Sequence, residues 1–379
     1  MRYIALIVLM PALFAAENKK LPEPYQTIAD LASTAPPEFT ADALLRIVES
    51  GRLPDKSQRA QLIEQAFQLG VSAKFPLRMT GVQGTTTDTA SGSLSQAYAL
   101  KLDALSLESR AVRDMLPLDP AKARDLFRQI ALPALTALDC DAALRYEPSD
   151  YYQALSAVVN GAFTAKEKAK EEHLNLLLDA LGQVSSSSQL APLEAAIKSA
   201  SLTTAQRETL LARFGALSAQ YARNDPDCKT APKIERYWQS AAAKRLLDGG
   251  TGLRVADRAK ADWQLQLPDY LNLIADWSQD PSESDAVFYH EKCLVYTSLL
   301  DLVRSGPQAD GILADFVAFV GNSGLYQRSP VEWFIDAYTV LDRSQGDPDR
   351  HAKVLAAFAR SGNPVLVLTV ALENAFHRT

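Results

Sequence analysis

Two side chains with the chemistry of metal ligands stand three positions apart in the C-terminal half. His290 and Cys293 would share one face of a helix, and imidazole nitrogen and thiolate sulfur are common zinc ligands. The sequence at 290–294, HEKCL, lacks the second histidine of H-E-x-x-H, and no third ligand follows from spacing. A cysteine on an apolar helix usually behaves as a small buried hydrophobe. We therefore predict no metal site and no cofactor.

Other constellations for catalysis or nucleotide binding are missing or incomplete. The motif G-x-S-x-G does not occur, and the serine run 185–188 stands at a helix end, where serines cap and turn the chain. Residues 248–252 (DGGTG) hold three glycines that would suit a phosphate, but no strand pattern precedes them, so we interpret them as a helix end and hinge. Carboxylates are numerous, but their separation in space does not follow from sequence. Catalytic residues are therefore unassigned, and enzymatic activity stays open.

Aromatic side chains offer one candidate binding surface. All four tryptophans, Trp238, Trp263, Trp277 and Trp333, lie in the C-terminal half. Trp263, Trp277 and Trp333 together with His290 would form an aromatic-lined groove for a peptide or a glycan. The alternative is that these rings wedge between packed helices, as aromatic residues at helical spacing usually do. We favour the alternative and keep the four residues as the candidate ligand groove.

The elements that must position these side chains are helices. Cap residues followed by proline and an acid, as in DPSE at 280–283 and SPVE at 329–332, are typical of helix starts. Leucines at 174, 177, 178 and 181 show helical spacing, and no alternating run predicts a strand. We predict an all-α fold of successive antiparallel helical hairpins, similar to α-solenoids and other helical-repeat proteins in general. The predicted helices are 24–33, 40–51, 56–73, 93–116, 120–138, 149–162, 165–184, 189–200, 204–223, 232–247, 255–278, 282–305, 308–321, 330–344, 348–360 and 364–377.

The chain is long enough for two helical subdomains. We expect a signal peptide at 1–16, helical hairpins at 17–79, a Gly/Thr/Ser-rich loop at 80–93, a central helical region at 94–248 and an aromatic-rich helical region at 249–379. The loop is interpreted as a linker, with a lid over a site as the alternative. The glycines near 250 mark the expected internal boundary.

The N-terminus and the charge balance indicate an exported protein. Arg2 precedes an apolar, uncharged stretch from Tyr3 to Ala16, which is the length of a secretory h-region and too short for a membrane span. We predict cleavage near Glu17 and a periplasmic or secreted location with no stable membrane span afterwards; the alternative is a retained single-helix anchor. The formal net charge of -6 and the scattered basic residues make nucleic acid an unsuitable partner.

Export also permits a disulfide. Cys140 and Cys228 both stand in polar segments just before a predicted helix, and the residues around them match weakly at the same offset. Cys293 instead lies inside a predicted apolar helix. We predict a Cys140–Cys228 disulfide with Cys293 as a buried free thiol; three reduced cysteines are the alternative.

Helix-pair arrays present long concave faces that bind partners through many modest contacts. We therefore expect an exported helical scaffold or interaction protein with a protein or peptide partner. The alternative is an enzyme or a receptor for a small ligand, peptide or glycan, with its site in the aromatic C-terminal half.

Overall fold

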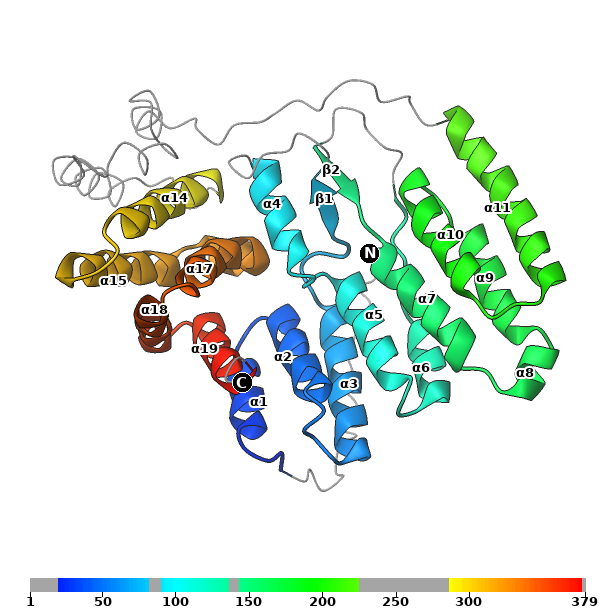
Figure 1. Ribbon diagram of the computed structural model, residues 1–379, viewed down its shortest axis with the longest axis horizontal. Coiled ribbons are helices and arrows are strands. Elements are labelled where there is room, and N and C mark those ends of the chain that lie inside the picture. The colour runs from blue at the N-terminus through cyan, green and yellow to red at the C-terminus, as the bar shows by residue number, and fades with distance from the viewer. Residues whose placement is uncertain (1–19, 82–89, 136–142, 225–285, 377–379) are drawn as a thin grey trace, which may run out of the picture.

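The computed structural model describes residues 20–81, 90–135, 143–224 and 286–376, and helices dominate them (Figure 1). The first helices are α1 (Tyr25–Ala32), α2 (Pro37–Glu49), α3 (Lys56–Val71), α4 (Ala90–Ala99), α5 (Ala104–Met115), α6 (Pro120–Phe127), α7 (Ser149–Gly161), α8 (Ala165–Ala169), α9 (Glu172–Gly182), the short 3₁₀ turn η1 (Ser187–Gln189), α10 (Leu190–Ser199) and α11 (Thr204–Asn224). The later helices are α14 (Ala286–Leu302), α15 (Pro307–Asn322), α16 (Leu325–Arg328), α17 (Pro330–Ser344), α18 (Pro348–Arg360) and α19 (Pro364–Phe376).

Strand structure in the described residues is confined to one short ladder. Strands β1 (Met79–Gly81) and β2 (Leu144–Tyr146) pair in antiparallel orientation, with Thr80 opposite Arg145. The predicted all-α class is therefore confirmed. Within the described residues, no helix is both long enough and apolar enough to cross a bilayer.

The order of the helices in space differs from their order in the chain. Helices α1, α2, α3, α5, α7, α10 and α11 each contact the next, and they run from the centre to the right of Figure 1. The C-terminal helix α19 packs against α1, and α17 packs against α4. Phe39 of α2 meets Phe334 of α17 edge to face, with ring centroids 5.2 Å apart. Buried apolar residues from Tyr25 to Leu368 form one continuous core. The predicted boundary at 249–252 lies outside the described residues, but the described helices after it share this core with α1–α4.

Within the described residues, most predicted helices occur close to their expected bounds, but the prediction of one helix over 93–116 is wrong. The predicted helices 232–247 and 255–278 lie outside the described residues. The chain breaks between α4 and α5 because Lys101 adopts a left-handed conformation (φ 57°). Asp103 then caps α5 by accepting a hydrogen bond from the Ser106 backbone N–H at 3.1 Å. Helix α4 also begins at Ala90, inside the predicted loop 80–93. Its contacts with α17 and β1 stabilise a Gly/Ser-rich first turn of low helix propensity.

Two further predicted helices are shorter than expected. Helix α6 ends at Phe127 instead of 138, so it stops before Pro133, which would have interrupted the predicted helix. The predicted helix 165–184 divides into α8 and α9 at Glu171, which has φ 60°. Helix α8 starts with a capping box, in which Thr164 and Glu167 each accept a hydrogen bond from the other's backbone N–H.

Candidate functional site

His290 lies at the junction of α4, α14 and α17, with 4% of its side chain exposed. Its Nδ1 is 2.5 Å from Asp336 Oδ2, and its Nε2 is 3.4 Å from Glu332 Oε1. Glu332 and Asp336 are four residues apart in α17, so both face the same neighbouring helix. Ser93 of α4 places its Oγ 3.4 Å from His290 Nδ1. The sequence singled out His290, but its three partners come from segments that local spacing does not connect.

The charges around His290 fix its protonation state. Burial lowers the pKa of His290, but the charge and hydrogen bond of Asp336, with a further contribution from Glu332, outweigh burial and raise it to about 10. The ring is therefore an imidazolium at neutral pH and donates Nδ1–H to Asp336 and Nε2–H to Glu332. Ser93, His290 and Asp336 are the residue types of a catalytic triad, but here the hydroxyl and the Asp336 carboxylate both face Nδ1. The cluster thus offers Ser93 no basic nitrogen and serves as a buried ion pair that joins three helices.

Trp333 belongs to the core beside this cluster. Its side chain has no exposed surface, and its indole Nε1–H donates to the Val320 carbonyl oxygen at 2.9 Å. Tyr289 donates its hydroxyl to the Trp333 carbonyl oxygen, also at 2.9 Å. For Trp333, the geometry is that of an aromatic wedge between helices. Trp263 and Trp277 lie outside the described residues, so the predicted groove that combines them with His290 stays a prediction.

Cys293, one turn after His290 in α14, is fully buried as a free thiol, as the sequence predicted. Burial raises the pKa of this thiol well above its ordinary value, which disfavours the thiolate form that binds metals. Among the described residues, no three His, Cys, Asp or Glu side chains are grouped so as to hold a metal ion. Cys140 and Cys228 of the predicted disulfide lie outside the described part of the chain.

A second site, not predicted from the sequence, is a cleft of about 540 Å³ between α2, α5 and the start of α7. We call it the charged cleft; its lining residues are Asp42, Arg46, Glu49, Leu100, Lys101, Ser106, Arg110, Arg113, Asp114 and Asp150. Nine of these ten side chains are polar or charged, and Leu100 is the exception. Small-ligand sites typically enclose about 300–1,000 Å³. A hollow between α14, α15 and α18 is smaller, at about 140 Å³.

Ion pairs between α2 and α5 form one wall of the charged cleft. Arg110 Nη1 is 2.6 Å from Asp42 Oδ1, and its Nε and Nη2 each lie 2.5 Å from an oxygen of Glu49. Arg46 Nε donates to the other Asp42 oxygen at 2.7 Å. Bidentate guanidinium–carboxylate pairs have strong directional preference. This wall is therefore held in one geometry, and its two carboxylates are already neutralised.

Asp150, in the first turn of α7, forms the opposite wall and is 2% exposed. It accepts hydrogen bonds from Arg78 Nε (2.9 Å), Lys101 Nζ (3.1 Å) and Ser106 Oγ (3.2 Å). Burial raises the pKa of Asp150, but the charge of Arg78 and the bond from Lys101 outweigh burial and lower it below its ordinary value. Lys101 reaches this carboxylate from the left-handed turn that separates α4 from α5.

Two lining residues of the charged cleft, both from α5, each have a buried polar atom without a hydrogen-bond partner among the described residues. Arg113 Nη1 donates to Gln153 Oε1 at 3.2 Å, while its buried Nε has no hydrogen-bond partner among the described residues. The neighbouring Asp114 has a buried Oδ2 that is likewise without a partner there. Burial, followed by the negative charge of Glu49, raises the pKa of Asp114 to about 7. At mildly acidic pH the cleft therefore holds a protonated carboxyl group beside an arginine.

Replacing Asp114 with asparagine is expected to raise the free energy of unfolding at pH 8 by up to about 4 kcal/mol and to change it little near pH 4. The folded-state pKa of Asp114 is raised, so the unfolded chain releases this proton first, and wild-type stability falls as pH rises from about 4 to about 7. Asparagine has the shape of the neutral acid and does not titrate. Urea unfolding at both pH values measures the difference; an equal effect at pH 4 and pH 8 would contradict the assignment.

No protein-family model, curated protein or solved structure matches this chain. Functional conclusions therefore rest on the geometry of the two sites.

Proposed function

We propose that the protein is an exported, non-enzymatic binding protein and that the charged cleft receives a ligand or a contact segment of a partner. The observation that carries this proposal is the combination of a volume near 540 Å³ with an almost wholly polar lining from three parts of the chain. Walls fixed by ion pairs keep such a lining pre-organised, which reduces the entropy lost on binding. This proposal gives a location to the interaction role expected from the sequence, and that location differs from the aromatic C-terminal half expected for the alternative, an enzyme or receptor.

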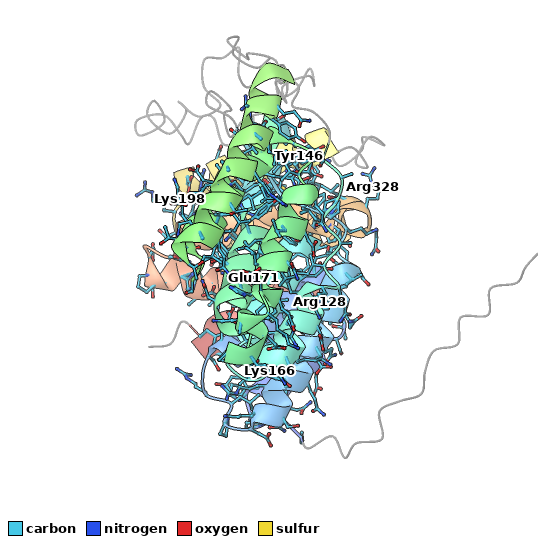
Figure 2. All side chains as sticks on the ribbon, turned by 90° about the vertical axis from the view of Figure 1, so that its right-hand side faces the viewer. Arg128, Tyr146, Lys166, Glu171, Lys198 and Arg328 are labelled. Atoms are coloured by element: carbon cyan, nitrogen blue, oxygen red, sulfur yellow. The ribbon has the colours of Figure 1, made fainter. Side chains whose placement is uncertain are left out.

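The helices support the proposal as a scaffold with a helical-repeat-like arrangement. Neighbouring helices stack from α1 to α11, and such arrays require a polar outer face on their last helix. On α11, Glu208, Arg213 and Gln220 are exposed, while Leu210 is buried against the preceding helices. Figure 2 looks onto this end of the molecule, where the exposed Glu171 and Lys198 lie at the surface. A polar end helix of this kind is what a terminal repeat needs to remain soluble.

Export is part of the proposal and has its own test. Arg2 followed by the apolar stretch Tyr3–Ala16 predicts removal of the signal peptide by the secretory pathway. Protein recovered from the producing cell is expected to begin near Glu17 in N-terminal sequencing. A variant with Leu6 and Val8 changed to Asp interrupts the apolar stretch and should accumulate uncleaved inside the cell. Recovery of wild-type protein with Met1 intact in the soluble interior would contradict export.

Ligand binding in the charged cleft is tested by thermal unfolding of the purified protein with small probes: propionate, methylammonium, inorganic phosphate and diglycine. At least one chemical class is expected to raise the midpoint, because ligand at about 100 times its Kd adds about 2.7 kcal/mol to the folded state. Hydrogen exchange should then show slower exchange in α2 and α5, with α15 and α18 as the internal control. No stabilisation by any probe, or protection confined to α15 and α18, would contradict the proposed function.

An acid–base enzyme is the second candidate, favoured by one observation. Glu49 and Asp114 face each other across the α2–α5 wall, and the pKa of about 7 lets Asp114 donate and accept protons near neutrality. Incubation of any bound probe with the wild type, followed by NMR detection of a product, separates the two candidates. Turnover that Asp114→Asn abolishes while leaving ligand binding intact would favour the enzyme.

A further inference from the structure

In the charged cleft, three of the carboxylates have an ion-pair partner, whereas one of the cations has none among the described residues. Four Arg and Lys and four Asp and Glu side chains line it. Asp42, Glu49 and Asp150 all have ion-pair partners. Arg113, by contrast, is partly buried and has one hydrogen bond, to a neutral amide, and no ion-pair partner among the described residues. When Asp114 is protonated, four cations face three carboxylates, which is an excess of one positive charge.

Resting on the proposed function, we infer that the charged cleft binds a small organic carboxylate whose oxygens accept hydrogen bonds from the Arg113 guanidinium. The guanidinium is a planar fork of five N–H donors whose geometry fits a carboxylate. Among the described residues, one of these donors makes a hydrogen bond, to Gln153. Asp114, the next residue of α5, is uncharged when protonated and then does not repel an anion. Lys101 has 51% of its side chain exposed and is bound to Asp150, and its ammonium adds a cation for a second contact.

The charge balance argues against the other simple ligand classes. Dianionic phosphate, the main form above about pH 7, would bring two negative charges toward three ionised carboxylates for an excess of only one positive charge. Monoanionic phosphate, the main form near pH 6, carries the matching charge, and the phosphate probe compares it directly with propionate. A cation would meet that positive excess, and the carboxylates it needs are already bound to Arg110, Arg46, Arg78 and Lys101. A monoanion with two acceptor oxygens matches both the charge and the donors. A free carboxylic acid and the C-terminus of a peptide share this chemistry.

Carboxylate binding is coupled to the protonation of Asp114. The charged groups that face it are Arg110 and Arg113 on α5 and Glu49 on α2. The remaining charges of the cleft come from α2, from α7 and from the α4–α5 connection, while α3 and α6 contribute no lining residue. Ionisation of Asp114 removes the positive excess. Affinity for a carboxylate should therefore fall as pH rises through neutrality.

Isothermal titration calorimetry of the purified protein tests the inference with matched probes: propionate against propionamide, and diglycine against diglycinamide. The carboxylates are expected to bind and the amides to bind at least tenfold more weakly, with affinity at pH 6 at least fivefold higher than at pH 8.5. Preference for diglycine identifies a peptide C-terminus, and preference for propionate identifies a free acid; both support the carboxylate assignment. Asp114→Asn should abolish the pH dependence.

Arg113→Met should weaken carboxylate binding at least tenfold, whereas Arg128→Met, at an exposed arginine after α6, should leave it unchanged. Thermal unfolding of both variants verifies that they fold. Equal binding of acid and amide, or retained affinity in folded Arg113→Met, would overturn the carboxylate inference. If methylammonium or phosphate binds instead and protects α2 and α5 from exchange, the proposed function stands and the inference fails. If no probe binds, both fail.

Discussion

Replacing His290 with alanine is expected to lower the free energy of unfolding at pH 7 by about 3–5 kcal/mol, because breaking a buried ion pair leaves an uncompensated charge. The imidazolium is 4% exposed and bridges Asp336 and Glu332 of α17, with Ser93 of α4 against the same ring. Its removal leaves two carboxylates of one helix facing each other without a cation. A loss of this size would take a large share of the stability of an ordinary domain.

The pH dependence of this loss has a defined sign. The folded-state pKa of His290, about 10, lies above the ordinary value of about 6.5. The contribution of its charge is therefore fully present below pH 6.5 and is lost as pH rises toward 10. The stability difference between wild type and His290→Ala should shrink between pH 7 and pH 9.5. Comparing the two proteins at each pH cancels the titration of the tyrosines that both contain.

Urea unfolding monitored by circular dichroism measures the His290 effect, and His351→Ala is the matched control. His351 also lies in a C-terminal helix, but it is partly exposed, and the described contact of its Nδ1 is a hydroxyl, Ser344 Oγ at 2.9 Å. We expect this control to cost less than about 1 kcal/mol. Similar losses for the two variants, or a His290→Ala loss that grows toward pH 9.5, would show that His290 is not held as a buried cation.

The local features of the fold could be read from the sequence, because they depend on neighbours in the chain. Proline after a cap residue placed the starts of α17 and α18 correctly, and the leucine stripe from 174 to 181 lies against the core as its spacing predicted. The errors at Lys101 and Glu171 have another cause. A left-handed residue in a run of good helix formers is stabilised by tertiary contacts, here the bond from Lys101 to Asp150, and these have no local signal.

The candidate sites depend on contacts that sequence spacing does not reveal. The return of α17 and α19 to α4 and α1 brings Ser93 beside His290, 197 positions away. The sequence indicates the charged cleft only in part, through charged residues at helical spacing. Asp42, Arg46 and Glu49 share one face of α2, and Arg110 and Asp114 share one face of α5. Each pattern alone is typical of a solvated helix surface. Only the packing of α5 against α2 and α7 turns the two surfaces toward each other and encloses a cleft.

Substitution of Asp150 should lower the free energy of unfolding by an amount comparable to that of His290→Ala. The pH dependence of this loss should lie in the acid range. Asp150→Asn is expected to lower the free energy of unfolding at pH 7 by about 3 kcal/mol, because it removes the counter-charge of a guanidinium that is itself almost buried. Arg78 is 11% exposed, and its other ion pair among the described residues, with Glu147, spans 3.9 Å. The substitution also removes the acceptor that fixes Lys101 at the rim of the charged cleft.

Stability measured at acid pH shows whether Asp150→Asn destabilises the protein by removing this ion pair or by disturbing the packing. The folded-state pKa of Asp150 is lowered, so its stabilisation is present above the ordinary pKa of about 4 and is lost as pH falls through the folded value. The difference between wild type and Asp150→Asn should stay constant from pH 8 to pH 5 and decrease below pH 4. Asp125→Asn is the control, because Asp125 is 60% exposed and 3.8 Å from Arg128, a pair worth less than about 1 kcal/mol. A loss for Asp150→Asn that persists unchanged at pH 3 would show that asparagine disturbs the packing of α7, and that the charge of Asp150 does not hold the wall of the cleft in place.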